Sequence, residues 1–230
     1  MSWLKGYLST EKEKLSRLHG REKGEYIWQY YKLWIIGAVV LVWAAGFFCY
    51  RFLFTPNDNW FFAVFTNTYA EVGNGSELWD GFVEYSGYDT REKNVEFNNA
   101  SYFDYTKNGG FGNTYYEAFV AYADSGTLDA VTMEKDQLVA LGASGRLKDL
   151  NREECAALRE KYGDRLVYTQ PYDEDYSTQP VPVGIDVSDS ILMTRYQIYS
   201  GDSCVLGIGA ESSHLEAVKT FLDYIFEEGQ

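Results

Sequence analysis

Polar side chains stand where three predicted strands end. Carboxylates, amides and hydroxyls of this kind bind ligands through hydrogen bonds. In open α/β sheets, ligands bind beyond the carboxyl ends of the strands, so these positions form the candidate rim of a ligand or partner site. The rim residues are Asn67, Thr68, Asn98, Asn99, Glu134 and Asp136.

Catalytic chemistry finds little support in the sequence. The two histidines, His19 and His214, do not provide a zinc-binding cluster, and no Ser/His/Asp set or nucleophile elbow can be drawn. Gly207-Ile208-Gly209 lacks the third glycine of a dinucleotide-binding fingerprint. The sequence therefore predicts a protein that is not an enzyme and uses no cofactor or metal. An exported enzyme remains the least favoured alternative.

Tyrosines are concentrated in predicted loops, and aromatic residues make up 17% of the chain. Exposed aromatic rings stack on sugar faces or on partner proteins. The alternative is that half of them pack in the core and the others cover an exported surface. The loop tyrosines are Tyr69, Tyr102, Tyr105, Tyr115, Tyr116, Tyr172 and Tyr176.

The elements that position these residues alternate between strand and helix. Short apolar or alternating runs predict strands over 60–66, 93–99, 128–133, 165–169, 181–186 and 204–209. Helical patterns lie over 76–85, 114–123, 134–141 and 151–161, and a last amphipathic helix follows Ser213. This order predicts β-α-β units, and hence one α/β domain over 55–230 with a mainly parallel sheet.

Before this domain lies the apolar segment 33–54. Its first eighteen residues carry no charge, and at about 1.5 Å per residue they span roughly 27 Å. The hydrocarbon core of a bilayer is about 30 Å thick, so the segment is predicted to be a transmembrane helix. Membrane-interface residues are expected at Trp28, Tyr31, Lys32, Trp34, Tyr50 and Arg51.

Charge predicts the orientation of this helix. Residues 1–51 carry a net charge of +4 and residues 52–230 carry −18, which together give −14. Basic residues stay on the cytoplasmic side. We therefore expect a cytoplasmic juxtamembrane helix over 1–32 and an extracytoplasmic domain on a single-pass membrane protein. A cleavable signal peptide and a lipid-anchored start at Cys49 are weaker alternatives, because the apolar run is too long and Cys49 follows two phenylalanines.

The net charge of residues 52–230 limits the possible partners, and two cysteines in the same region could form a disulfide. A net charge of −18 cannot neutralise phosphates, which argues against nucleic acid as a partner. Cys155 and Cys204 lie on the exported side, where an oxidising environment would allow them to pair. Two buried free thiols are the commoner outcome for a chain with so few cysteines.

Three segments resemble the extracellular solute-binding proteins of bacterial ABC importers, which have the type II periplasmic-binding fold. They are 125–150 (SGTLDAVTMEKDQLVALGASGRLKDL), 181–190 (VPVGIDVSDS) and 206–225, with the pattern AVK-x-FL-x-YI. The resemblance covers the chain from about Trp60 to Phe226 and implies one lobe of that fold. Family members have two lobes and are usually lipoproteins in Gram-positive bacteria. No ligand-binding residue of the family matches a motif here.

These features lead to a functional prediction with two branches. A single tethered lobe is expected to bind a partner protein or an envelope component. The alternative is a tethered receptor for an ABC importer, with a carbohydrate or other small solute as its ligand and a second lobe supplied by another chain.

Overall fold

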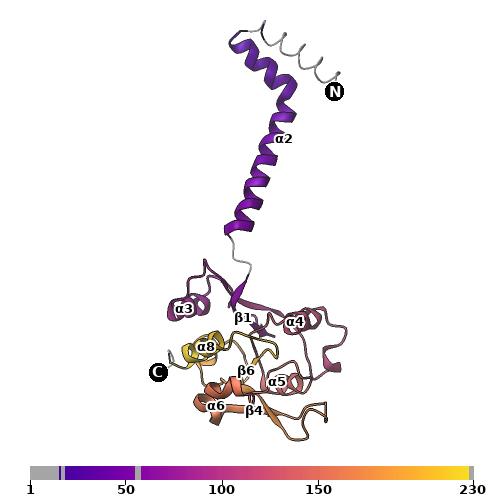
Figure 1. Ribbon diagram of the computed structural model, residues 1–230, viewed down its shortest axis with the longest axis vertical. Coiled ribbons are helices and arrows are strands. Elements are labelled where there is room, and N and C mark those ends of the chain that lie inside the picture. Colours follow the sequence, from indigo (N-terminus) through magenta and orange to yellow (C-terminus); the bar gives the residue numbers. More distant parts are fainter. Residues whose placement is uncertain (1–15, 17–18, 55–57, 228–230) are drawn as a thin grey trace. The chain divides into compact units, whose positions relative to one another are not determined.

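A computed structural model of the chain describes residues 16, 19–54 and 58–227. The chain divides into two compact units, Met1–Thr55 and Pro56–Gln230. The first unit contains one long helix, α2, over Arg21–Phe54 (Figure 1). The predicted juxtamembrane helix therefore runs into the apolar segment without a break from Arg21 onward. Its earlier part, at 1–15 and 17–18, lies outside the described residues.

Helix α2 is the only helix in the described part of the chain that is long and apolar enough to cross a membrane. A signal sequence near the N-terminus can meet the same criterion of length and hydropathy, so the criterion alone is weak evidence for a membrane anchor. The expected interface residues Trp28, Lys32, Trp34 and Tyr50 are exposed on this helix, and Tyr31 is half-buried. The side chain of Arg51 lies outside the described residues.

The second unit contains six strands and six α-helices among the residues that the structure describes (Figure 1). The strands are β1 Asn59–Thr66, β2 Asn94–Ser101, β3 Ala130–Met133, β4 Leu166–Thr169, β5 Val181–Asp186 and β6 Val205–Ile208. The α-helices are α3 Glu77–Ser86, α4 Thr114–Asp124, α5 Lys135–Gly142, α6 Ala156–Tyr162, α7 Ile191–Thr194 and α8 Leu215–Glu227. Short 3₁₀ helices are η1 Asn108–Gly110, η2 Glu153–Cys155 and η3 Gly163–Arg165.

The six strands form one mixed sheet in the order β2-β1-β3-β6-β5-β4. Strand β1 pairs in parallel with β2 and β3, whereas the three pairings that join β3, β6, β5 and β4 are antiparallel. The prediction of a mainly parallel sheet is therefore wrong. A parallel crossover needs about a dozen residues or more and usually a helix. The segment from Gln170 to Pro180 contains no helix, so β4 and β5 pair as neighbouring antiparallel strands.

Alternate residues of β1 point into two separate hydrophobic cores, as expected for a strand with a helix layer on each face. Phe61, Ala63 and Phe65 face the core that includes buried residues of α3, α6, α7 and α8. Phe62 and Val64 face the core formed with α4 and α5. This two-sided burial explains why the first strand is a continuous apolar run.

Both cysteines of the second unit are buried free thiols. Cys155 and Cys204 belong to the same hydrophobic core, and burial raises the pKa of each thiol. The possible disulfide between them is therefore not formed in the structure. The expectation that Cys155 and Cys204 are two buried free thiols is confirmed.

Candidate functional site

A cavity of about 470 Å³ lies at the carboxyl ends of β1 and β3. We call it the carboxyl-edge cavity. Its volume is within the range of roughly 300–1,000 Å³ that small-molecule sites occupy. Its lining residues come from the segment after β1, the start of α5 and the loop before β6: Asn67, Thr68, Tyr69, Ala70, Glu134, Tyr196, Gln197, Ile198, Tyr199 and Ser200.

Two predicted rim residues, Asn67 and Thr68, hold the walls of this cavity together. The Asn67 amide donates to the carbonyl oxygen of Phe103 at 2.7 Å and accepts from the Phe103 N–H at 2.9 Å. The hydroxyl of Thr68 donates to the carbonyl of Ile198 at 2.5 Å and accepts from the Ala70 N–H at 3.1 Å. The polar atoms of both side chains therefore position the surrounding loops.

Other polar groups remain available to a ligand. Glu134 is the N-cap residue of α5, but its carboxylate makes no capping hydrogen bond. It is the only charged residue among the described residues that line the cavity. Gln197 and Ser200 add an amide and a hydroxyl from the loop before β6. The cavity thus offers one carboxylate beside neutral donors and acceptors, which suits a neutral ligand rich in hydroxyl groups.

Backbone strain coincides with the cavity. Asn67 has φ of 55° and Gln197 has φ of 48°, and they are the two non-glycine residues with positive φ among the described residues. Both line the carboxyl-edge cavity. A left-handed backbone is unusual for glutamine, and such conformations cluster at ligand sites where the surrounding structure maintains them.

The floor of the cavity is rigid because Tyr199 is hydrogen-bonded to the ends of the central strands. Its hydroxyl donates to the carbonyl oxygen of Thr132 at 2.6 Å, and the Thr132 hydroxyl lies 3.0 Å from it. The Thr66 hydroxyl donates to the same carbonyl at 3.1 Å. Burial raises the pKa of Tyr199 well above its usual value, so the phenol stays protonated at neutral pH.

A row of three tyrosines, Tyr69, Tyr102 and Tyr115, begins at the lip of the cavity. The ring centroids of Tyr69 and Tyr102 are 5.2 Å apart, and those of Tyr102 and Tyr115 are 5.7 Å apart. Tyr69 is 90% exposed and Tyr115 is 48% exposed. Asn113 caps α4 and also donates to the Tyr102 carbonyl oxygen, so the start of α4 positions the row.

The structure places the six predicted rim residues differently. Asn67, Thr68 and Glu134 line the cavity, and Asn99 supports it from behind by donating to the Ala70 carbonyl oxygen at 2.7 Å. Asn98 instead accepts from the N–H of Ala100 at the end of its own strand. Asp136 is exposed in the first turn of α5 and is not a lining residue.

The loop from Tyr196 to Ser200 was missed by sequence reasoning, although it supplies half of the lining. This loop precedes β6, which is antiparallel to β3. The amino end of an antiparallel strand lies at the carboxyl edge of its neighbour. A sheet assumed to be parallel therefore puts the loop at the wrong edge. The unusual backbone of Gln197 has no sequence signal that we can identify.

A Ser/His/Asp group that the sequence did not suggest occurs at the other end of β3. The fully buried carboxylate of Asp129 accepts from the Phe62 N–H at 2.9 Å and from the Ser212 hydroxyl at 2.6 Å. Nδ1 of His214 lies 3.1 Å from it. The serine donates to the carboxylate and not to the imidazole, so the order of a catalytic triad is absent. The group instead ties β1 to the segment before α8.

No group of three or more His, Cys, Asp or Glu residues within the described ranges could hold a metal ion. No protein-family model matches the chain. Likewise, no curated protein and no solved structure matches it. The geometry of the carboxyl-edge cavity is therefore the basis for any functional conclusion.

Proposed function

We propose that the protein is a membrane-anchored binding domain that holds a carbohydrate of the cell envelope in the carboxyl-edge cavity. One observation carries this proposal: an exposed tyrosine row leads into a cavity whose free polar groups are Glu134, Gln197 and Ser200. Aromatic faces stack on the apolar faces of sugars, as they do on other flat apolar groups. A carboxylate and an amide can each accept hydroxyl protons, and the amide can also donate.

The proposed anchor is α2, with its N-terminus in the cytoplasm and the second unit outside. Seven Lys or Arg residues precede the apolar segment, and a basic flank remains on the cytoplasmic side. The aromatic residues at its two ends suit the membrane interface. In this arrangement the cavity is on the same side of the membrane as the envelope glycans.

A tethered solute receptor for an importer is the second candidate function. Its support is the size of the cavity, about 470 Å³, which fits a small soluble ligand as well as the end of a polymer. The two candidates share the same site. They differ in whether the ligand is attached to the envelope or diffuses freely.

Photocrosslinking in cells separates these candidates. A photoreactive amino acid at Ser200, which lines the cavity, is expected to capture an envelope glycan that stays attached after extensive washing. The matched position is Asp136, which is exposed but is not a lining residue. Capture of only a small, freely diffusing sugar at Ser200 would favour the receptor. Equal capture at both positions would contradict the site.

A further inference from the structure

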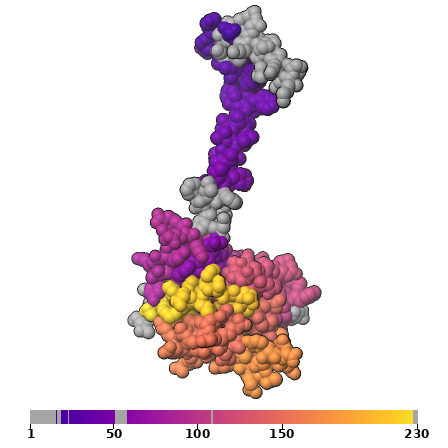
Figure 2. Space-filling model, in the orientation of Figure 1, coloured from indigo at the N-terminus to yellow at the C-terminus, as the bar shows by residue number. Residues whose placement is uncertain are grey.

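A second cavity, which we call the loop cleft, lies at the opposite edge of the sheet. It is formed under the loop that joins β4 to β5, residues 170–180, and has a volume of about 280 Å³. Strand β5 runs in the same direction as β3 through their shared neighbour β6. Its start, where the loop ends, is therefore at the amino edge. In Figure 2 this loop forms the orange lobe at the lower edge of the domain.

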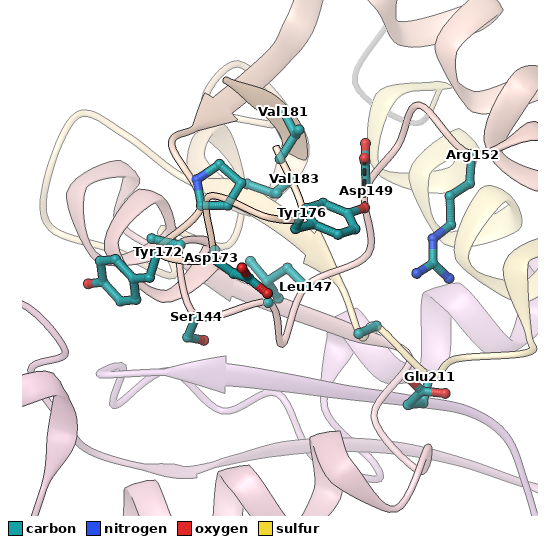
Figure 3. Close-up of a pocket in the computed structure, with 15 residues that line it drawn as sticks. Ser144, Leu147, Asp149, Arg152, Tyr172, Asp173, Tyr176, Val181, Val183 and Glu211 are labelled. Carbon is teal, nitrogen blue, oxygen red and sulfur yellow. Dashed lines mark hydrogen bonds between the residues drawn. The ribbon is translucent and has the colours of Figure 1, made fainter. Parts of the chain in front are cut away.

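The inner surface of the loop cleft is apolar. Leu147, Val181 and Val183 are buried residues that line it, and Figure 3 shows their side chains around the ring of Tyr176. The N–H of Tyr172 donates to the Ala143 carbonyl oxygen at 2.9 Å, which fixes the loop to the end of α5. The cleft thus has an anchored aromatic cover over an aliphatic base.

The outer rim of the loop cleft is acidic. Asp149, Asp173 and Glu211 line it together with a single cation, Arg152, which leaves a net charge of −2. The Tyr176 hydroxyl donates to Asp149 Oδ2 at 2.9 Å and so holds a carboxylate beside the aromatic ring. Within the described residues, no hydrogen bond is made to the carboxylate of Glu211. A positive group at the rim would therefore meet several carboxylates and the face of a tyrosine.

Size and charge together define the occupant. A volume of about 280 Å³ falls below the usual range of roughly 300–1,000 Å³ for whole small-molecule ligands. It suits one long side chain inserted from outside. Lysine and arginine have an aliphatic stem that packs on apolar surface and a charged end that stays at the rim. An acidic rim repels glutamate, and a purely aliphatic side chain would have no charge for the carboxylates to attract.

We infer that the loop cleft is a docking site for a lysine or arginine side chain presented by a segment of a partner protein. The apolar base would hold the stem of that side chain, and the acidic rim would attract its charge. This site is separate from the carboxyl-edge cavity in position and in residues. It therefore does not depend on the proposed carbohydrate function.

Blocked pentapeptides, Ac-Gly-Gly-X-Gly-Gly-NH₂, provide the probe. X is lysine, arginine, norleucine or glutamate, and binding is measured by titration against the full chain in nanodiscs. The test variant is Asp173→Asn/Glu211→Gln. Asparagine at 173 keeps an oxygen for the Asp175 N–H, which donates to Asp173 in the structure. The control, Glu117→Gln/Glu160→Gln, removes the same charge from exposed positions outside the cleft.

The lysine and arginine peptides are expected to bind at least about tenfold more tightly than the norleucine and glutamate peptides. The test variant should lose about tenfold in affinity for them, and the control should bind as the wild type does. Equal binding of norleucine, an equal loss in the control, or no binding of either basic peptide up to about 10 mM would each overturn the inference. Unchanged circular dichroism establishes that the variants are folded.

Discussion

The hydroxyl of Tyr102 donates a 2.7 Å hydrogen bond to the main-chain carbonyl oxygen of Thr68. This contact joins the middle ring of the tyrosine row to the wall of the carboxyl-edge cavity. Tyr102 and Tyr115 come from the segment after β2 and the start of α4, whereas Tyr69 and the wall follow β1. One hydrogen bond therefore connects the stacking surface to the polar cavity, and the two can act as one extended site.

Removing Tyr69 tests the stacking surface. Tyr69→Ala is expected to weaken oligosaccharide binding by about tenfold, or ~1.4 kcal/mol, because the most exposed ring of the row is lost. Tyr102→Phe keeps the aromatic ring but loses the hydrogen bond to the Thr68 carbonyl oxygen. It should therefore lower the free energy of unfolding by about 1 kcal/mol. Tyr168→Ala, at a half-exposed tyrosine of β4, is the control for titration calorimetry. Equal losses for Tyr69→Ala and Tyr168→Ala would argue against a specific row.

Asp129 is expected to be among the most sensitive positions for stability. Asp129→Asn should lower the free energy of unfolding by about 2–3 kcal/mol, because a buried carboxylate with three donors loses its charge-assisted bonds. Asp124→Asn, at an exposed carboxylate, should change it by less than about 0.5 kcal/mol. Urea unfolding of both variants gives the comparison. A small effect at Asp129 would mean that the group does not tie β1 to the segment before α8.

Acid should weaken the fold through carboxylates with lowered pKa values. The Lys148 ammonium donates to Glu154 at 2.7 Å and lowers the pKa of Glu154. This stabilisation is complete above the ordinary pKa of a glutamate and is lost as the pH falls through the lower folded value. The urea midpoint should therefore fall as the pH drops below about 4.5, the ordinary pKa of a glutamate.

Lys148 is only 4% exposed, so its partner matters at neutral pH as well. Glu154→Gln should lower the urea midpoint at pH 7 and reduce its fall in acid. The double variant Lys148→Met/Glu154→Gln should recover stability at pH 7, because no buried charge is left without a partner. A Glu154→Gln variant with the wild-type midpoint at pH 7 and the same acid sensitivity would show that the pair is unimportant.

Much of the fold follows from local pattern, but strand direction does not. The strand predicted at 181–186 occurs at those residues because its short run of mostly apolar residues, buried from Val181 to Ile185, is a local feature. The direction of β6 depends on contacts with β3 and β5, which are distant in sequence. The same limitation explains which cavity residues could be predicted. Glu134 was predicted from its position after β3. Gln197 and Ser200 were not, because they reach the cavity only when β6 runs antiparallel to β3.

Topology can be tested by chemical labelling. In a Cys49→Ala background, Asp136→Cys is expected to react with an impermeant maleimide on intact cells, and Ser16→Cys only after permeabilisation. Cys155 and Cys204 should stay unreactive while the protein is folded, because they are buried and burial raises their thiol pKa values. The reverse labelling pattern would contradict the orientation. A mature protein lacking residues 1–54 would identify α2 as a cleaved signal sequence.

The most direct test of the central claim is titration of soluble oligosaccharides into the full chain in nanodiscs. Chito-, cello- and malto-oligosaccharides are compared for the wild type, Glu134→Gln and the neighbouring control Asp136→Asn. The account predicts that at least one series binds, that Glu134→Gln weakens its binding by about tenfold or more, and that Asp136→Asn does not. No binding up to about 10 mM, or equal binding by Glu134→Gln and the wild type, would contradict it.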